Sequence, residues 1–193
     1  MNKIKLGFAL TGSFCTFEQN LRLMEELAND NYDILPIMSF NASNLDTRFG
    51  KAKDFRDRIE DICKKKIICS IEEAEPIGPK KMTDIMLVSP CTGNTLSKLA
   101  YSITDTPVTM AVKSHLRNNL PVVIGVSTND ALAGSAKNIG ILSNLRNYYF
   151  VPLRQDNSKG KPNSLVARFD MTKQSLECAL NNVQLEPVVL PPL

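Results

Sequence analysis

One stretch of sequence decides the fold, and it reads Val88-Ser89-Pro90-Cys91-Thr92-Gly93-Asn94-Thr95. The apolar run Ile85–Val88 leads into it and predicts a short buried strand. After it, apolar residues recur at the i, i+3, i+4 and i+7 spacing of a helix face, from Leu96 to Ile103. The stretch is therefore a turn between the carboxyl end of a strand and the N-terminus of a helix. Open α/β sheets bind ligands at such turns.

The side chains of this turn are small and polar. Ser89, Thr92, Asn94 and Thr95 offer hydrogen-bond donors and acceptors, and Gly93 allows a close approach of the backbone. The helix N-terminus adds unpaired N–H groups and a partial positive charge. Helix caps use the same residue types, so a capped turn without a ligand stays an open alternative.

Small polar residues also follow three other apolar runs that predict strands, which end at Leu10, Met38 and Val126. The residues in question are Gly12 and Ser13, Ser39, and Ser127 to Asn129. Predicted strands alternate with predicted helices along the chain, which indicates an α/β three-layer sandwich with a parallel sheet and helices on both faces. The four polar turns then converge on one edge of the sheet and predict a ligand site there.

Composition limits the function classes. With 193 residues, the chain suits one domain spanning 1–193. A net charge of +3 gives no electrostatic case for a nucleic acid or a membrane surface, so we expect neither partner. Five cysteines without a CxxC pair and one histidine predict free thiols rather than disulfides or a metal site. The start resembles a signal peptide, but Thr11-Gly12-Ser13 interrupts its apolar run, so we expect a cytoplasmic protein.

Several local features carry predictions of their own. Thr16 to Gln19 fits a capping box at the start of a helix, and Asn41 to Lys51 reads as a polar loop. Ile67 to Ser70 predicts a short strand, and Tyr148 to Leu153 predicts the last strand. The first turn lacks the lysine of a P-loop, which leaves open a phosphate held by backbone N–H groups and the Ser13 hydroxyl.

A polar segment at about 154–164 predicts a mobile loop. Its cations, or those beside it, are candidates for a lid over an anion; the alternative is that they are ordinary loop charges. They are Arg154, Lys159, Lys161 and Arg168. The apolar tail 187–193 is expected either to pack on a neighbouring subunit or to fray.

Together, the Leu10–Ser13 turn, Ser39 and the run Pro90–Ala100 resemble the homo-oligomeric FMN-binding family. That family includes cysteine decarboxylases and flavin prenyltransferases. The resemblance implies a flavodoxin-like or Rossmann-like sandwich, FMN as cofactor, and assembly as trimers or dodecamers. The residues that it places around FMN are Gly12, Ser13, Ser39, Pro90, Cys91, Thr92, Asn94, Thr95, Ser127 and Asn129. For Cys91, redox activity and simple packing are both open.

The chain also departs from the decarboxylases of that family. It has no histidine shortly before the strand Ile85–Val88, and of the Pro-x-Met-Asn motif only Asn129 remains. We therefore do not expect oxidative decarboxylation of a cysteine. A decarboxylase or prenyltransferase, and a flavoprotein without catalytic activity, remain the alternatives.

Two segments, Pro76–Lys80 and Pro162–Arg168, resemble one branch of the family from spore-forming bacteria. In that branch the protein is the B subunit of a two-subunit oxidoreductase. The resemblance implies a partner, the A subunit, with a dinucleotide fold for NADP or NAD. It implies oxidation of a dihydro ring to an aromatic dicarboxylic acid in the mother cell during sporulation. Lys161 and Arg168 are the candidate substrate-binding residues. No catalytic residue is assigned.

Overall fold

The structure is a computed structural model, and it describes residues 3–191. Its strands form one seven-stranded sheet in the order β2-β1-β3-β4-β7-β6, and β5 pairs with β4. The strands are β1 (Ile4–Leu10), β2 (Tyr32–Met38), β3 (Ile85–Cys91), β4 (Val122–Thr128), β5 (Tyr148–Phe150), β6 (Leu153–Arg154) and β7 (Leu165–Ala167). The pairs among β2, β1, β3, β4 and β5 are all parallel, which is the flavodoxin-like strand order.

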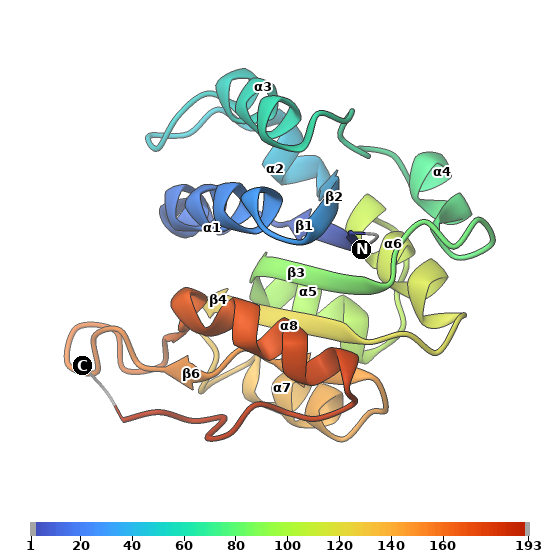
Figure 1. Cartoon of the computed structure of the whole chain (residues 1–193). Coiled ribbons are helices and arrows are strands. Elements are labelled where there is room, and N and C mark those ends of the chain that lie inside the picture. The colour runs from blue at the N-terminus through green and yellow to red at the C-terminus, as the bar shows by residue number, and fades with distance from the viewer. Residues whose placement is uncertain (1–2, 192–193) are drawn as a thin grey trace.

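Helices cover both faces of this sheet. They are α1 (Phe17–Asn29), α2 (Phe40–Asn44), α3 (Ala52–Cys63), α4 (Ile71–Ala74), α5 (Gly93–Ala100), α6 (Pro107–Leu116), α7 (Ala136–Ser143) and α8 (Thr172–Leu180). In Figure 1, α1 and α8 lie in front of the sheet, and α5, α6 and α7 lie behind it. The predicted three-layer α/β sandwich is confirmed.

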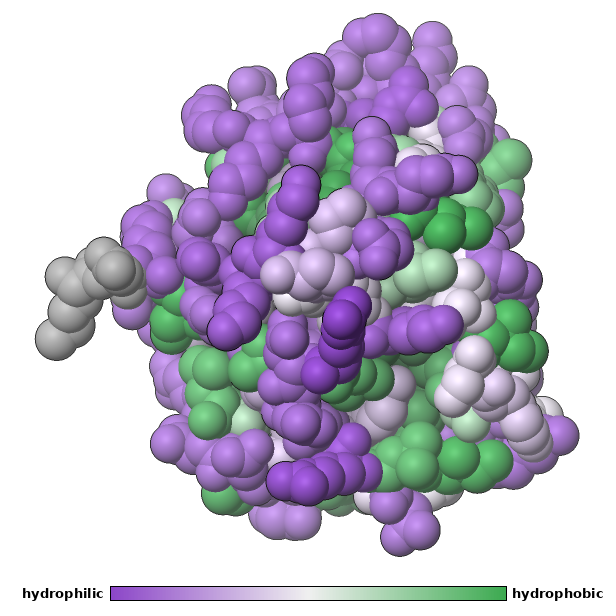
Figure 2. All heavy atoms as spheres, turned by 90° about the vertical axis from the view of Figure 1, so that its right-hand side faces the viewer, coloured by the Kyte–Doolittle hydropathy of each residue, from purple (hydrophilic) through white to green (hydrophobic). Residues whose placement is uncertain are grey.

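The central strands are buried on both faces, as continuous apolar runs in a parallel sheet require. Every residue of β3 is buried, and Phe8 of β1 and Ile124 of β4 are fully inaccessible. The strands run from right to left in Figure 1, so their carboxyl ends meet at the left. Figure 2 looks at the opposite edge, where hydrophilic residues cover much of the surface and hydrophobic ones form separate patches.

An antiparallel extension makes the sheet mixed. Ser127 and Thr128, the last residues of β4, pair with Val166 and Leu165 of β7, and β7 pairs in turn with β6. The segment 154–164 therefore connects two paired strands at the carboxyl edge of the sheet. Its mobility stays a prediction.

The start of the apolar tail pairs within the chain. The Leu153 N–H donates to the Val188 carbonyl at 2.7 Å, and the Leu190 N–H donates to the Leu153 carbonyl at 2.8 Å. Residues 192–193 of the predicted tail lie outside the described part of the chain.

The predicted capping box and the predicted polar loop both need correction. Thr16 is the N-cap of α1, as predicted, but its side chain makes no capping bond, because its hydroxyl donates to the Ser13 carbonyl and to the Ser127 hydroxyl instead. Asn41 to Lys51 is not loop throughout: α2 occupies its first part, and the Ser39 side chain caps that helix by accepting from the Ala42 N–H at 3.3 Å.

Two predicted strands differ in extent from those in the structure. Within Ile67–Ser70 only Ile68 pairs, in an isolated bridge to Ile37. The predicted strand Tyr148–Leu153 is divided into β5 and β6 around Val151 and Pro152. Proline has no N–H to donate to a sheet, which explains the interruption. None of the helices within residues 3–191 has both the length and the apolar character that crossing a membrane requires.

Candidate functional site

A cavity of about 730 Å³ lies beyond the carboxyl ends of β1, β3 and β4. Its volume is within the range of small-molecule sites. Most of the predicted flavin-binding residues line it, namely Gly12, Ser13, Thr92, Asn94, Ser127 and Asn129. Lys161, a predicted substrate-binding residue, lines it as well. The structure thus brings three of the four predicted turns together around one space.

Ser39 and Thr95 do not line the cavity, because both are buried at the starts of α2 and α5. Ser39 caps α2 as described above, and the Thr95 N–H donates to the Thr92 hydroxyl at 3.4 Å. Both side chains are buried. They therefore shape the turns from behind rather than face a ligand.

Pro90 and Cys91 also lie behind the cavity. The Pro90 carbonyl is an acceptor within the protein, and the Cys91 side chain is fully buried. Burial raises the pKa of the Cys91 thiol, so the reactive thiolate is disfavoured. Packing is the role that the structure supports for Cys91.

Thr11 joins the turns after β1 and β3, although it was not among the predicted site residues. Its hydroxyl donates to the Pro90 carbonyl at 2.7 Å and accepts from the Thr92 N–H at 3.0 Å. Its own N–H donates to the same carbonyl at 3.2 Å. A side chain that is 1% exposed therefore fixes two turns of the cavity relative to each other.

A second set of hydroxyl groups connects the turns after β1 and β4. The Ser13 and Ser127 hydroxyls are 2.8 Å apart, and the Thr16 hydroxyl donates to the Ser127 oxygen at 3.3 Å. Behind them, the Ser89 hydroxyl donates to the Asn20 side chain at 2.6 Å, deep in the core. These bonds keep Ser13 and Ser127 side by side at the wall of the cavity.

The glycine of the β3 turn is required by its neighbours. A Cβ atom at Gly93 would lie 2.6 Å from the Ser135 hydroxyl and 2.8 Å from the Asp130 carboxylate. Asp130 in turn accepts from the hydroxyls of Thr128 at 2.6 Å and Ser135 at 3.0 Å. Tight packing of the loop after β4 against the start of α5 therefore accounts for this glycine.

Arg48 and Phe49, in the predicted polar loop, line the cavity but were not predicted as site residues. The Arg48 guanidinium lies 4.9 Å from the centre of the Phe49 ring, and both side chains line the cavity with Phe14. An arginine beside an exposed aromatic residue in a loop after a strand was the available signal. The cavity thus offers hydroxyl and amide groups, a helix N-terminus, aromatic surface and the cations Arg48 and Lys161. Its two carboxylates are already engaged, Asp130 with the Thr128 and Ser135 hydroxyls and Asp156 with Lys161. This combination suits an anionic ligand with an aromatic ring.

A second cavity of about 550 Å³ adjoins the first and lies between α1 and the β6–β7 hairpin. The two share the lining residues Cys15, Asp156, Lys161 and Val166. The Lys161 ammonium pairs with Asp156 at 3.2 Å, so this ion pair stands between the cavities. Arg168 lines the second cavity only, and its guanidinium pairs with Asp170.

The fold and site define the class of protein: the chain belongs to the Flavoprotein family, whose model matches residues 1–177. It is 45% identical to the B subunit of dipicolinate synthase from Bacillus subtilis (strain 168), over 96% of this chain and 93% of that protein. The crystal structure of the dipicolinate synthase B subunit from Bacillus halodurans is 42% identical, with a TM-score of 0.90 and complete coverage of both chains. The predicted resemblance to the B subunits of dipicolinate synthase is confirmed.

More distant structures share the fold. One is the FMN complex of DmrB from Burkholderia xenovorans, described as a cubic protein cage for redox transfer. Its identity to this chain is 18%, its TM-score is 0.69, and the match covers 93% of this chain and 97% of that one. At this identity the likeness establishes the architecture alone.

Proposed function

We propose that this chain binds FMN in the cavity at the carboxyl edge of the sheet and acts as the B subunit of a dipicolinate synthase. The observation that carries the proposal is the convergence of the turns after β1, β3 and β4 on a single polar cavity. The FMN complex of DmrB and the curated relative in Bacillus subtilis support the choice of cofactor and pathway.

The residues present fit FMN. The phosphate is assigned to the turn of Gly12 and Ser13, with Arg48 as its counter-ion, because backbone N–H groups, hydroxyls and a cation together compensate a buried anion. The ribityl hydroxyls and the ring are assigned to Thr92 and Asn94, with Asn129 on the opposite wall. Ser39, Pro90, Cys91 and Thr95 hold these turns from behind.

In the proposed reaction, a dihydrodipicolinate loses a hydride and a proton and becomes the aromatic dicarboxylic acid. Bound FMN supplies a two-electron acceptor, and NADP or NAD on the A subunit is the alternative acceptor. The dicarboxylate is assigned to the neighbourhood of Lys161, which stands between the two cavities, and of Arg168, which lines the second one, because positive charges attract its two carboxylates.

The A subunit of dipicolinate synthase is the proposed protein partner, and the mother cell of a sporulating bacterium is the proposed location. We also propose that the chain associates with itself, as a trimer or dodecamer. The cage formed by DmrB, which shares the fold, supports self-association.

The flavin site is tested by titrating the purified chain with FMN and following flavin fluorescence. Wild type should show saturable binding, and Gly12→Asp should abolish it, because its carboxylate would repel the phosphate. Gly12→Ala is the matched control: a Cβ atom there would meet only the Phe14 ring at 3.6 Å and Asn41 at 3.7 Å, which are ordinary contacts. Binding by Gly12→Asp that equals wild type would remove the phosphate assignment.

Activity is tested separately, by purifying the chain with and without the A subunit. Formation of dipicolinic acid only by the assembled pair, with a flavin absorbance spectrum, is the expected result. Equal turnover by the isolated partner, in the absence of this chain, would contradict a catalytic role for it.

A further inference from the structure

The second cavity contains an arginine whose charge is not paired. Arg154 of β6 lines this cavity and is partly buried. Within residues 3–191, no carboxylate forms an ion pair with its guanidinium and no side-chain or carbonyl acceptor takes its hydrogen bonds. A partly buried guanidinium with open donors favours an anionic ligand, because its five N–H groups otherwise lose hydrogen bonds to water.

The other cations of this cavity already have partners. Arg168 donates to both oxygens of Asp170, at 2.9 Å and 2.5 Å, and these bonds hold the pKa of the Asp170 carboxyl below its usual range. Lys161 pairs with Asp156, and Arg22 on α1 pairs with Glu18 at 3.4 Å. The charge of Arg154 makes a small contribution to the lowered pKa of Asp170, but both oxygens of that carboxylate accept hydrogen bonds from Arg168 and not from Arg154.

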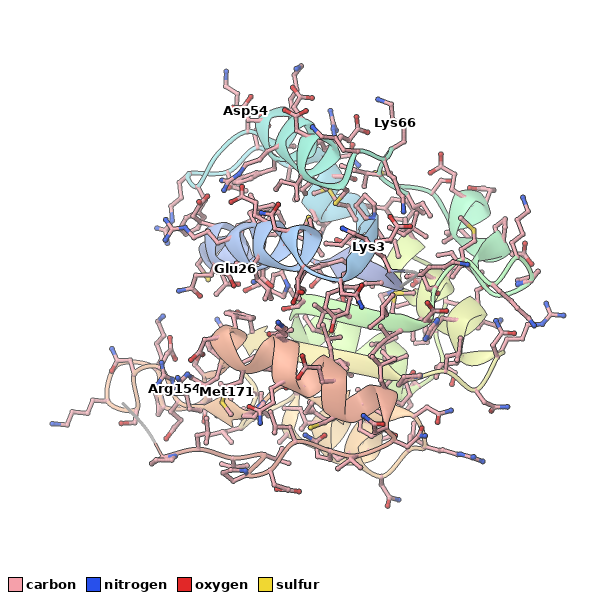
Figure 3. All side chains as sticks on the ribbon, viewed as in Figure 1. Lys3, Glu26, Asp54, Lys66, Arg154 and Met171 are labelled. Atoms are coloured by element: carbon pink, nitrogen blue, oxygen red, sulfur yellow. The ribbon has the colours of Figure 1, made fainter. Side chains whose placement is uncertain are left out.

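The opposite wall carries an acidic side chain. Figure 3 labels Glu26 on α1 and Arg154 on the hairpin, and the two lie on opposite sides of the space between these elements. Both line the cavity, and they do not pair with each other. A ligand between them therefore meets a cation on one side and a carboxylate on the other, so the anionic group of a ligand is attracted to the Arg154 wall and repelled from the Glu26 wall.

From this arrangement we infer that the second cavity is the substrate subsite, and that Arg154 binds a carboxylate of a small aromatic or dihydroaromatic dicarboxylic acid. The inference rests on the proposed function and deepens it. The substrate ring then lies beside the shared wall of Lys161 and Asp156, next to the cavity assigned to FMN. In this arrangement Arg154 makes the direct contact with the substrate carboxylate. Two N–H donors of the Arg168 guanidinium are already bonded to Asp170, so Arg168 contributes through its charge.

The subsite is tested by calorimetric titration of the full chain with pyridine-2,6-dicarboxylate, in the presence of saturating FMN. Arg154→Gln should weaken binding by about ten- to a hundredfold, the usual effect of removing one charge-assisted contact. Lys159→Gln is the matched control, because it removes one charge from the same hairpin at an exposed position that lines neither cavity. It should change the dissociation constant by less than about twofold.

Two further arms separate the possible ligands. Inorganic phosphate at equal concentration should bind more weakly and should not compete, because it lacks the ring and the second carboxylate of the dicarboxylate, although a guanidinium pairs with either anion. The FMN titration should be the same for wild type and Arg154→Gln. Wild-type affinity of Arg154→Gln for the dicarboxylate, equal weakening in both variants, or competition by phosphate would each overturn the inference.

Failure of FMN binding is a separate outcome. If the chain does not bind FMN, the same dicarboxylate titrations on the FMN-free chain decide the subsite alone. Loss of the proposed cofactor and loss of the proposed subsite are therefore distinguishable.

Discussion

The only histidine of the chain should lower stability at acidic pH. His115 of α6 is 1% exposed, far inside the protein. Its Nε2 lies 3.0 Å from the Pro121 carbonyl, which can only accept, so the neutral ring donates from Nε2. Its Nδ1 then accepts from the Thr83 hydroxyl at 2.8 Å. The native environment thus satisfies the neutral ring completely.

Burial lowers the pKa of His115 from 6.5 to about 4, against small opposing contributions from the Pro121 carbonyl and the charge of Asp84. Because the folded pKa lies below the unfolded one, the unfolded state binds the proton first as the pH falls. The titration of His115 therefore does not change the free energy of unfolding above about pH 7 and lowers it between about pH 6.5 and 4. A shift of this size corresponds to about 3 kcal/mol in full, of which about 2 kcal/mol is lost by pH 5.

The measurement is urea unfolding of wild type and His115→Gln at pH 7.5 and pH 5.0, followed by circular dichroism. The glutamine keeps one donor and one acceptor, and carboxylate contributions are common to both proteins. Wild type should lose about 2 kcal/mol more than the variant over this range. NMR titration of the single imidazole gives an independent value. An imidazole that titrates near 6.5, or equal losses in both proteins, would refute the reasoning.

Two further predictions concern the walls of the first cavity. Thr11→Val keeps the shape of the side chain and removes the two bonds that its hydroxyl makes between the turns, whereas the backbone N–H bond to the Pro90 carbonyl stays. It should cost about 1–3 kcal/mol of unfolding free energy in urea and weaken FMN binding in a fluorescence titration. Unchanged affinity would show that the Thr11 hydroxyl does not position the turns. Alkylation followed by mass spectrometry should modify exposed Cys15 in the native protein and buried Cys91 only after unfolding; rapid native labelling of Cys91 would contradict its packing role.

The sequence predicted the architecture because apolar runs and helix periodicity are local signals. Buried strands of a parallel sheet need continuous apolar residues, and the run Ile85–Val88 supplies them for β3. The antiparallel hairpin was missed because β6 and β7 are too short to carry a pattern: β6 has 2 residues and β7 has 3. Their pairing depends on the end of β4, which is distant in sequence.

The site was predicted in its location more than in its individual contacts. The carboxyl ends of parallel strands meet at one edge of the sheet, so Gly12, Ser13, Asn94 and Asn129 line one cavity as expected, whereas Ser39 after β2 does not. Arg48 was not predicted, because the residues of its loop show no periodic pattern that would indicate the path of the loop toward the cavity.

The residues that were misplaced share one physical property. Caps and ligand sites both use small hydroxyl residues, because each task is to pair an unsatisfied N–H group or a nearby charge. Ser39 uses its oxygen to accept from the Ala42 N–H, whereas Ser13 shares its hydroxyl with Ser127 at the cavity wall. Capping does not by itself exclude a place at the cavity, because the Thr92 hydroxyl caps α5 by accepting from the Thr95 N–H and Thr92 still lines the cavity. The position that the fold gives each residue, rather than residue type, therefore separates the groups that face the cavity from those that support it.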